Sequence, residues 1–355
     1  MMKKVILSFL ALFMLCEHLE ARTILRKKDP NIPEITIGWK NSKKRITRSN
    51  WAYKEDPIFT SFNEPYFNSH HIPADTIPAK NDPNTLYDCR IINKQITHLL
   101  SEIKKGKKQY TYFTILKDKN FNHSQRCGLI ILKFKNYPLV LKLFMETPKT
   151  FIDPYCKGFE NQFFFYMSGG MNRYFLGFTR VKNLEMVKEQ IENNARWKDR
   201  VTLPRKWYWK PKKTRWIEVR GKNIGDNTKE ITTQMPSVYA IIADELDTKE
   251  DAPSLSSKEK SKLIMELCMD LRLFVDPHAD NFVIKAIQDN TDYSINIVDT
   301  EHFPSVIGLK EEPTFTNHLE WYLYLGTKYF QDAFLQTKYD RKEAQYRPNP
   351  YKIEW

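Results

Sequence analysis

Long apolar runs and paired cysteines are both scarce in this chain of 355 residues. The one extended apolar run, 5–16, is too short to span a bilayer comfortably, because a membrane helix needs about 20 residues. Five cysteines without a C-x-x-C pair argue against a disulfide framework and against a zinc site. The sequence contains no internal repeat and no signature of a nucleic-acid-binding module. A chain of this length accommodates one large domain or two ordinary ones.

The first 21 residues have the pattern of a signal peptide. Lys3 and Lys4 precede the apolar run, and Ala21 then offers a small residue for cleavage. We therefore expect cleavage near Ala21, export, and a periplasmic or secreted location. An uncleaved anchor or a buried N-terminal segment is the alternative.

Four cysteines follow this segment. Cys268 falls on the apolar face of a predicted helix, and we expect it to be a core thiol. Export permits disulfides, so one bridge among Cys89, Cys127 and Cys156 stays open, and the sequence does not choose the pair.

Basic residues exceed acidic ones, which gives a net charge of +13. This excess suggests a polyanionic or phosphorylated partner, or an anionic membrane surface. It is concentrated at 196–222 (Arg196 to Lys222), where eleven basic residues accompany two acidic ones. Five aromatic residues are interleaved: Trp197, Trp207, Tyr208, Trp209 and Trp216. Such a mixture suits phosphate backbones with stacked bases or lipid headgroups, whereas the alternative is an insertion whose aromatic side chains pack inward.

The chain changes character near residue 105. Residues 22–104 contain many turn-forming Pro, Asn and Asp residues, which predicts an irregular N-terminal extension. We expect its aromatic residues to pack on the main body. A short helix is predicted at 91–104. Strands are predicted at 110–116, 128–134 and 139–144, rich in aromatic and β-branched residues. They would form an antiparallel meander.

Further elements follow the meander. The segments 216–219 and 238–242 could complete a sheet of about five strands, and 117–125 is predicted to be a polar loop. Helices are predicted at 159–167, 184–201 and 317–335. The strongest helix prediction is 256–274, because Ser256 and Glu259 form a capping box before apolar residues at helical spacing. A strand pair is predicted at 281–284 and 294–298.

Two short stretches carry candidate catalytic chemistry. In the first, Asp276 and Asn281 are five residues apart, with His278 between them. In the second, Asp299 directly follows the apolar run 295–298, which is broken only by one Asn. A positioned Asp can accept a proton from a hydroxyl, and carboxylate and amide oxygens are ligands that Mg²⁺ prefers. Together they make up the phosphoryl-transfer half of a kinase-type site.

This order and spacing resemble the protein-kinase-like fold, and specifically its aminoglycoside/choline phosphotransferase branch, which carries D-x-H-x-x-N in the catalytic loop. A long helix leads into that loop, matched by 256–274, and a strand, a turn and a strand ending in Asp follow it. The third strand of the meander carries Lys142, where the family has a Lys. Residues 238–246 resemble the strand and hinge that receive an adenine ring. The resemblance covers roughly 105–335.

The resemblance implies an α+β, bilobal protein-kinase-like fold with a β-rich N-lobe and a short, mainly helical C-lobe. The implied organisation is a signal peptide at 1–21, an irregular extension at 22–104, an N-lobe with a basic insertion at 105–246, a C-lobe at 247–345 and a tail at 346–355.

The resemblance also implies ATP and Mg²⁺ as cofactors. Asn281 and Asp299 would hold Mg²⁺. Asp276 would accept the proton of the acceptor hydroxyl, and His278 would orient the loop backbone.

Three further residues are implied in nucleotide binding. Lys142 would neutralise the α and β phosphates and would itself be oriented by a carboxylate from the following helix. Glu160 is the first candidate for that carboxylate, and Glu146 is the second. Glu245, in the hinge, would contribute to binding the nucleotide.

The leading hypothesis is therefore an exported phosphotransferase that moves the γ-phosphoryl group of ATP to an unknown hydroxyl acceptor. The first alternative is a catalytically inactive secreted pseudokinase that acts as a binding or scaffold protein, since 117–125 contains no Gly and only 56 residues follow Asp299. The second alternative is a secreted protein that binds a polyanion or a membrane surface through 196–222.

Overall fold

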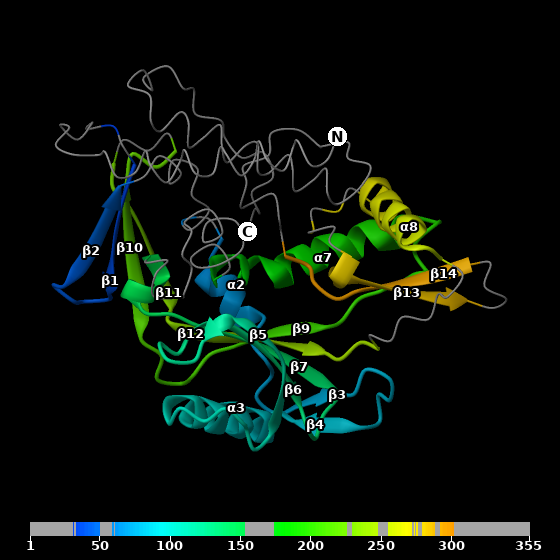
Figure 1. Ribbon diagram of the computed structural model, residues 1–355, viewed down its shortest axis with the longest axis horizontal. Coiled ribbons are helices and arrows are strands. Elements are labelled where there is room, and N and C mark those ends of the chain that lie inside the picture. Colours follow the sequence, from blue (N-terminus) through cyan, green and yellow to red (C-terminus); the bar gives the residue numbers. More distant parts are fainter. Residues whose placement is uncertain are drawn as a thin grey trace, which may run out of the picture. The chain divides into compact units, whose positions relative to one another are not determined.

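The computed structural model divides the chain into two compact units, Met1–Ile32 and Pro33–Trp355, and the elements described below belong to the second (Figure 1). The structure describes residues 31, 33–49, 59, 61–152, 174–225, 229–247, 255–271, 273, 275, 279–287 and 292–301. The predicted signal peptide, the predicted helices at 159–167 and 317–335, and the site residues Asp276, His278 and Glu160 lie outside the described residues.

The largest sheet begins with the predicted meander. Its five strands are β5 (Phe113–Asn122), β6 (Cys127–Phe134), β7 (Leu139–Met145), β9 (Lys206–Trp209) and β12 (Val238–Asp244). Their order is β5-β6-β7-β12-β9, and every neighbouring pair is antiparallel. The fold is therefore a mixed α+β fold, which confirms the coarser part of the prediction.

One strand expected in this sheet lies elsewhere. β10 (Trp216–Lys222) belongs to a separate antiparallel sheet, with β1 (Glu34–Trp39), β2 (Arg45–Ser49) and β11 (Ile231–Pro236) in the order β11-β10-β1-β2. The placement predicted for 216–219 is thus wrong, and β9 takes that place in the larger sheet. Apolar alternation marks a strand but does not identify its partner, and β1 comes from far upstream.

The N-terminal extension is not irregular where the structure describes it. Besides β1 and β2, it contains α2 (Glu64–Ser69), β3 (Thr76–Pro78), β4 (Leu86–Asp88) and α3 (Cys89–Lys104). The prediction of an irregular segment at 22–104 is wrong for these elements, because short strands between Pro and Asn residues leave little periodicity to detect.

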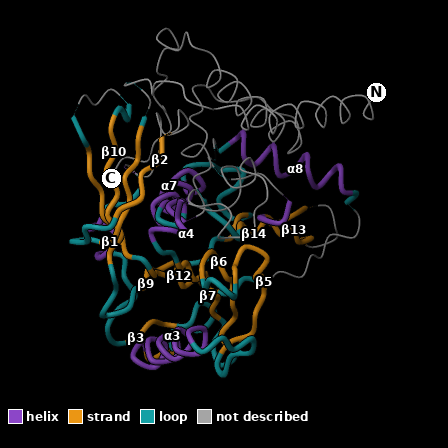
Figure 2. Tube along the Cα trace, turned by 60° about the vertical axis from the view of Figure 1, so that its left-hand side comes forward, coloured by secondary structure: helices purple, strands orange, loops and turns teal. Residues whose placement is uncertain are grey.

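The helix α3 confirms the prediction at 91–104 and covers one face of the five-stranded sheet (Figure 1, Figure 2). The side chain of Asp88 caps its first turn by accepting a hydrogen bond from the Arg90 amide at 2.8 Å. Four buried residues recur at helical spacing toward the sheet: Ile92, Ile96, Leu99 and Ile103. The apolar stripe therefore determines which face of α3 packs inward.

The hairpin between β5 and β6 is longer than predicted, so the interpretation of 117–125 as a polar loop is wrong. β5 continues to Asn122 with two shifts of register against β6. Gly128 has φ of 103°, and a Cβ placed there would lie 2.1 Å from the carbonyl oxygen of Asn120. Irregular pairing lets polar residues stay in the strand, and only glycine fits where the two backbones approach so closely.

The second half of the chain supplies two longer helices and a three-stranded sheet. The helix α7 (Thr179–Glu192) begins five residues before the predicted helix at 184–201 and ends earlier, and α8 (Ser257–Asp270) has the predicted capping box. β13 (Phe282–Ile287) and β14 (Asp292–Ile297) confirm the predicted strand pair, and β8 (Val201–Thr202) adds a parallel edge. A short helix, α4 (Pro148–Ile152), follows β7.

Both faces of the five-stranded sheet are covered by apolar side chains. On the face opposite α3, Tyr239 and Ile241 of β12 belong to one core cluster with Phe178, the residue that precedes α7, and with Val219 of the four-stranded sheet. A third cluster joins α7 and α8 to the β13–β14 pair through Val187, Leu267, Ile284 and Ile295. The helix α7 therefore contacts both the large sheet and the hairpin that carries the second predicted motif.

The described cysteines are buried. Cys89 is a free thiol, and burial raises its pKa to about 11. Cys268 is a core residue of the third cluster, as predicted, whereas Cys156 lies outside the described residues. Within the described ranges no helix combines the length and apolarity needed to cross a bilayer.

Candidate functional site

Lys142 and Asp299, both predicted to bind the phosphates or their metal, lie in direct contact. Lys142 is at the middle of β7, and Asp299 follows β14. The Lys142 Nζ atom is 2.8 Å from Asp299 Oδ2, and their side chains are only 9% and 18% exposed. Two residues far apart in the sequence thus form a largely buried ion pair.

Asn281 is hydrogen-bonded through its backbone to Val298, the residue before Asp299. It ends a short helical turn, Ala279–Asn281, directly before β13, and its carbonyl oxygen accepts a hydrogen bond from the Val298 amide at 2.8 Å. The register of the strand pair, with Phe282 opposite Ile297, continues this alignment. Asn281 and Asp299 therefore stand at the same end of one hairpin.

Arg180 from α7 is the second partner of Asp299. Its Nε donates to Asp299 Oδ1 at 2.8 Å, and its Nη2 contacts both Asp299 and Glu301. The side chain is 1% exposed, and its guanidinium lies 5.6 Å from the ring centroid of Phe144. The helix α7 thus contributes a guanidinium to the cluster.

Lys206, the first residue of β9, completes the cluster from the sheet. Strand alternation places Lys142 and Lys206 on the same face as Tyr208, the face covered by α7. The Lys206 Nζ donates to Thr300 Oγ1 at 2.7 Å, and this hydroxyl donates to the Arg180 carbonyl oxygen at 2.6 Å. Lys206 and Thr300 are both buried.

Burial and charge act against each other in the cluster. Burial lowers the pKa of Lys206 well below its ordinary value and also lowers the pKa of Lys142, although Asp299 opposes both shifts. Burial likewise opposes ionisation of Asp299, but the charges of Arg180, Lys142 and Lys206 outweigh it and hold the pKa of Asp299 well below its usual range. Despite burial, Asp299 and Glu301 raise the pKa of Arg180. Asp299 and Arg180 are therefore both charged at neutral pH.

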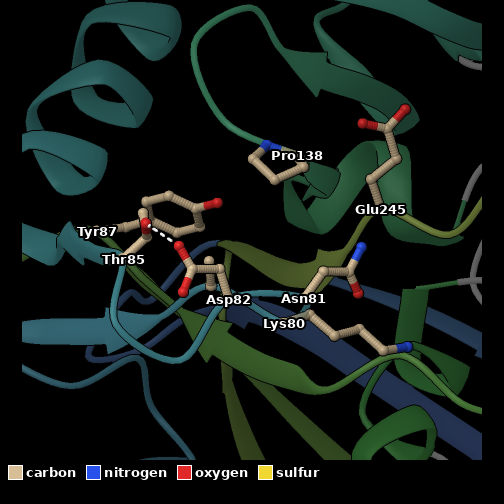
Figure 3. Close-up of a pocket in the computed structure, with 8 residues that line it drawn as sticks. Lys80, Asn81, Asp82, Thr85, Tyr87, Pro138 and Glu245 are labelled. Carbon is tan, nitrogen blue, oxygen red and sulfur yellow. Dashed lines mark hydrogen bonds between the residues drawn. The ribbon is translucent and has the colours of Figure 1, made fainter.

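Glu245 lies apart from this cluster. On β12 the residue opposite Lys142 is Ile241, so Glu245 lies beyond the end of that strand. Its carboxylate binds Lys133 Nζ at 2.5 Å. It also lines a cavity of about 160 Å³ with polar residues of the N-terminal extension, among them Lys80 and Asp82 (Figure 3).

Glu146 is the second candidate for the carboxylate that orients Lys142. Glu146 is buried just after β7, and its amide donates to the Ser237 carbonyl oxygen at 2.9 Å. The partner that the structure gives Lys142 is Asp299. Glu160 lies outside the described residues.

Several charges of the basic stretch are used in ion pairs on separate elements. Arg196 binds Glu266 and Asp270 of α8 at 2.9 and 2.8 Å. Arg205 binds Asp244 at 2.8 Å, and Lys206 belongs to the buried cluster. Three of the interleaved aromatic residues are fully buried: Trp197, Tyr208 and Trp209. These three aromatic side chains therefore pack inward.

Arg180, Lys206 and Glu301 were not identified from the sequence. Glu301 lies two residues after Asp299, and this spacing of two acidic residues was the sequence signal that could have identified Glu301. Arg180 precedes the start of the predicted helix, and Lys206 is one of many basic residues in its stretch.

Comparisons with protein-family models, curated proteins and solved structures found no match to this chain. Function is therefore inferred from the site itself. In the part of the chain that the structure describes, no three His, Cys, Asp or Glu side chains gather as a metal site. Among the residues that the structure describes, Asp299 and Glu301 bring carboxylate oxygens to the site, and Asn281 lies at the same end of the hairpin as Asp299.

Proposed function

We propose that this chain is an exported phosphotransferase with a bilobal protein-kinase-like fold, which moves the γ-phosphoryl group of ATP to a hydroxyl acceptor. The observation that supports it most is the contact between Lys142 and Asp299 at 2.8 Å. The resemblance assigns both residues to the same phosphate site, through two separate motifs. A chance Lys on one strand and a chance Asp after another have no reason to meet.

The residues have distinct parts in this proposal. Lys142 neutralises charge on the nucleotide phosphates, and Asp276 accepts the proton of the acceptor hydroxyl and holds it in line. His278 orients the loop backbone. These two residues stand immediately before the turn that ends at Asn281, so the hairpin that holds Asn281 and Asp299 would also anchor the loop of the base.

The donor chemistry at the hairpin fits Mg²⁺. Hard oxygen ligands are what this ion requires, and Asn281 and Asp299 supply an amide and a carboxylate at one end of the strand pair. When bound, Mg²⁺ would neutralise charge on the phosphates. Asp299 would have to exchange part of its contact with Lys142 or Arg180, which is favourable once phosphates are present to bind those cations.

The test is thermal unfolding of the full chain with ATP, with and without Mg²⁺, for the wild type and Asp299→Asn. A ligand at about 100 times its Kd stabilises the folded state by about 2.7 kcal/mol, and we expect a Mg²⁺-dependent part of this gain to disappear in the variant. Asp276→Asn should keep the stabilisation and lose ATP turnover. If Asp299→Asn kept both the Mg²⁺ effect and turnover, the proposed metal role would be wrong.

A pseudokinase is the second candidate, and one observation favours it. Both carboxylate oxygens of Asp299 already accept hydrogen bonds from cationic side chains, Oδ1 from Arg180 and Oδ2 from Lys142. A binding or scaffold protein would keep this arrangement permanently. Stabilisation by ATP without any turnover, unchanged by Mg²⁺, would select this candidate over the enzyme.

A further inference from the structure

The cluster around Asp299 holds more cationic groups than carboxylates. Within the described residues, Lys142, Arg180 and Lys206 face the acids Asp299 and Glu301. All three cationic residues are less than a tenth exposed, at 7%, 1% and 6%. The imbalance lies in a place shielded from water, where a charge without a counter-charge costs free energy.

Two of these cationic side chains have donors to spare. The Nη1 atom of Arg180 is buried and has no hydrogen-bond partner among the residues that the structure describes. Lys206 donates to the hydroxyl of Thr300, which is a neutral acceptor, at 2.7 Å. The cluster therefore lacks one anionic group.

We infer that Arg180 and Lys206, together with Lys142, form a phosphate-binding site that works without a metal ion. Its ligand is the phosphate chain of a nucleoside triphosphate, and for the nucleotide part this inference rests on the proposed function. A guanidinium donates from a planar fork to phosphate oxygens, and buried ammonium groups add point charges. The fixed cations thus perform part of the neutralisation that a metal usually supplies.

Asp299 and Glu301, whose side chains are each 18% exposed, are the more accessible members of the cluster. A phosphate chain arriving there competes with the two carboxylates for Arg180 and Lys142. Asp299, once freed from these two cations, would be able to hold a metal ion that adds further neutralisation of charge, but binding itself does not depend on that ion.

The experiment measures thermal unfolding of the full chain in EDTA with three ligands: ATP, inorganic tripolyphosphate and adenosine. We expect ATP and tripolyphosphate, at about 100 times their Kd, to raise the melting temperature by about 5 °C or more, and adenosine to have little effect. An effect of ATP without one of tripolyphosphate would show that the nucleoside, and not the phosphate chain, is recognised, and would overturn the inference.

Lys206→Met is the decisive variant, because it removes a buried cation whose hydrogen bond goes to a neutral hydroxyl. We expect it to fold with equal or greater stability and to bind tripolyphosphate at least about tenfold more weakly in EDTA. Lys135→Met is the matched control, since Lys135 Nζ also binds only neutral groups, the carbonyl oxygens of Tyr110 and Thr111 at 2.8 and 3.0 Å. Its binding should equal that of the wild type. Arg180→Lys, which keeps the charge and loses the fork, should weaken binding as well.

The outcomes separate this inference from the proposed function. Binding of ATP only with Mg²⁺ would overturn the inference and leave the phosphotransferase intact. Binding in EDTA that is lost in Lys206→Met, together with no ATP turnover when Mg²⁺ is supplied, would support the inference and contradict the enzyme. Equal binding by the wild type and Lys206→Met in EDTA would show that this cluster is not the phosphate site.

Discussion

At the scale of single residues, the interior of this protein contains several charged groups whose partners come from distant segments. Asp299 is held by residues of β7 and α7, and Glu102 at the end of α3 is held by residues beyond it. Such groups link stability to pH and to one another, because neither burial nor pairing alone determines their charge state.

Glu102 is expected to make stability depend on pH. Its side chain, 3% exposed, accepts hydrogen bonds from the Thr111 amide and hydroxyl and from Lys107 Nζ. Burial opposes ionisation, but these bonds outweigh it and lower the pKa of Glu102 in the folded state. A lowered pKa gives stability that is present above the unfolded pKa, near pH 4, and is lost as the pH falls through the folded pKa. Glu102→Gln should therefore cost about 1–2 kcal/mol at pH 7.

Urea unfolding at pH 7 and at about pH 3.5 checks this expectation. The difference between the wild type and Glu102→Gln should shrink at the lower pH. A difference of the same size at both values would mean that the carboxylate acts through its shape and not its charge.

The pair of Lys142 and Asp299 should show strong energetic coupling. In a double-mutant cycle with Lys142→Met and Asp299→Asn, we expect a coupling of about 1–3 kcal/mol, because each single change leaves a largely buried charge with one partner fewer. The pair of Lys133 and Glu245 is the control, since its side chains are 41% and 30% exposed, and its coupling should stay below about 1 kcal/mol. Equal couplings measured by urea unfolding would contradict the burial seen at Asp299.

Three residues of the cluster region could be predicted from the sequence because local patterns mark them. Lys142, Asn281 and Asp299 each lie in or directly beside a strand that its own residues identify. Arg180 and Lys206 gain their role only from tertiary contacts, with a carboxylate and a hydroxyl far away in the chain. No local pattern marks such residues.

At the scale of elements, local signals predicted the type of element well and its limits less well. The capping box at Ser256 begins α8 as expected, and the strand pair β13–β14 was identified from its apolar runs. The predicted first strand of the β5–β6 hairpin was too short, because irregular pairing interrupts the alternation of apolar and polar residues on which a strand prediction depends.

Gly128 is the residue on which this hairpin depends most. In Gly128→Ala, the new Cβ would sit on a residue with φ of 103° and lie 2.1 Å from the Asn120 carbonyl oxygen. The backbones of β5 and β6 must therefore separate. We expect a loss of about 2–4 kcal/mol in the free energy of unfolding. Gly106→Ala is the control, because Gly106 has φ of 72° with open space around it, and should cost only about 1 kcal/mol. Similar losses in urea unfolding would show that conformation alone, and not the close contact, requires glycine at 128.

At the scale of the whole molecule, the pairing of strands from distant segments could not be predicted from the sequence. Strand β10 pairs with β1, which lies far upstream in the sequence, and β9 pairs with β12. The choice between partners depends on complementary faces and on the entropy of closing long loops, neither of which a local pattern contains.

The sheet formed by β1 and β10 predicts that the segment 33–49 is structural and not a dispensable extension. Ile37 in β1 is fully buried and lies in the same core cluster as Val219, its register partner on β10. Ile37→Ala should therefore lower the free energy of unfolding by about 2–5 kcal/mol. Ile46→Ala, on the neighbouring strand β2 and only partly buried, should cost clearly less. If urea unfolding showed a loss below about 0.5 kcal/mol for Ile37→Ala, the value typical of surface positions, β1 would not be part of the folded core.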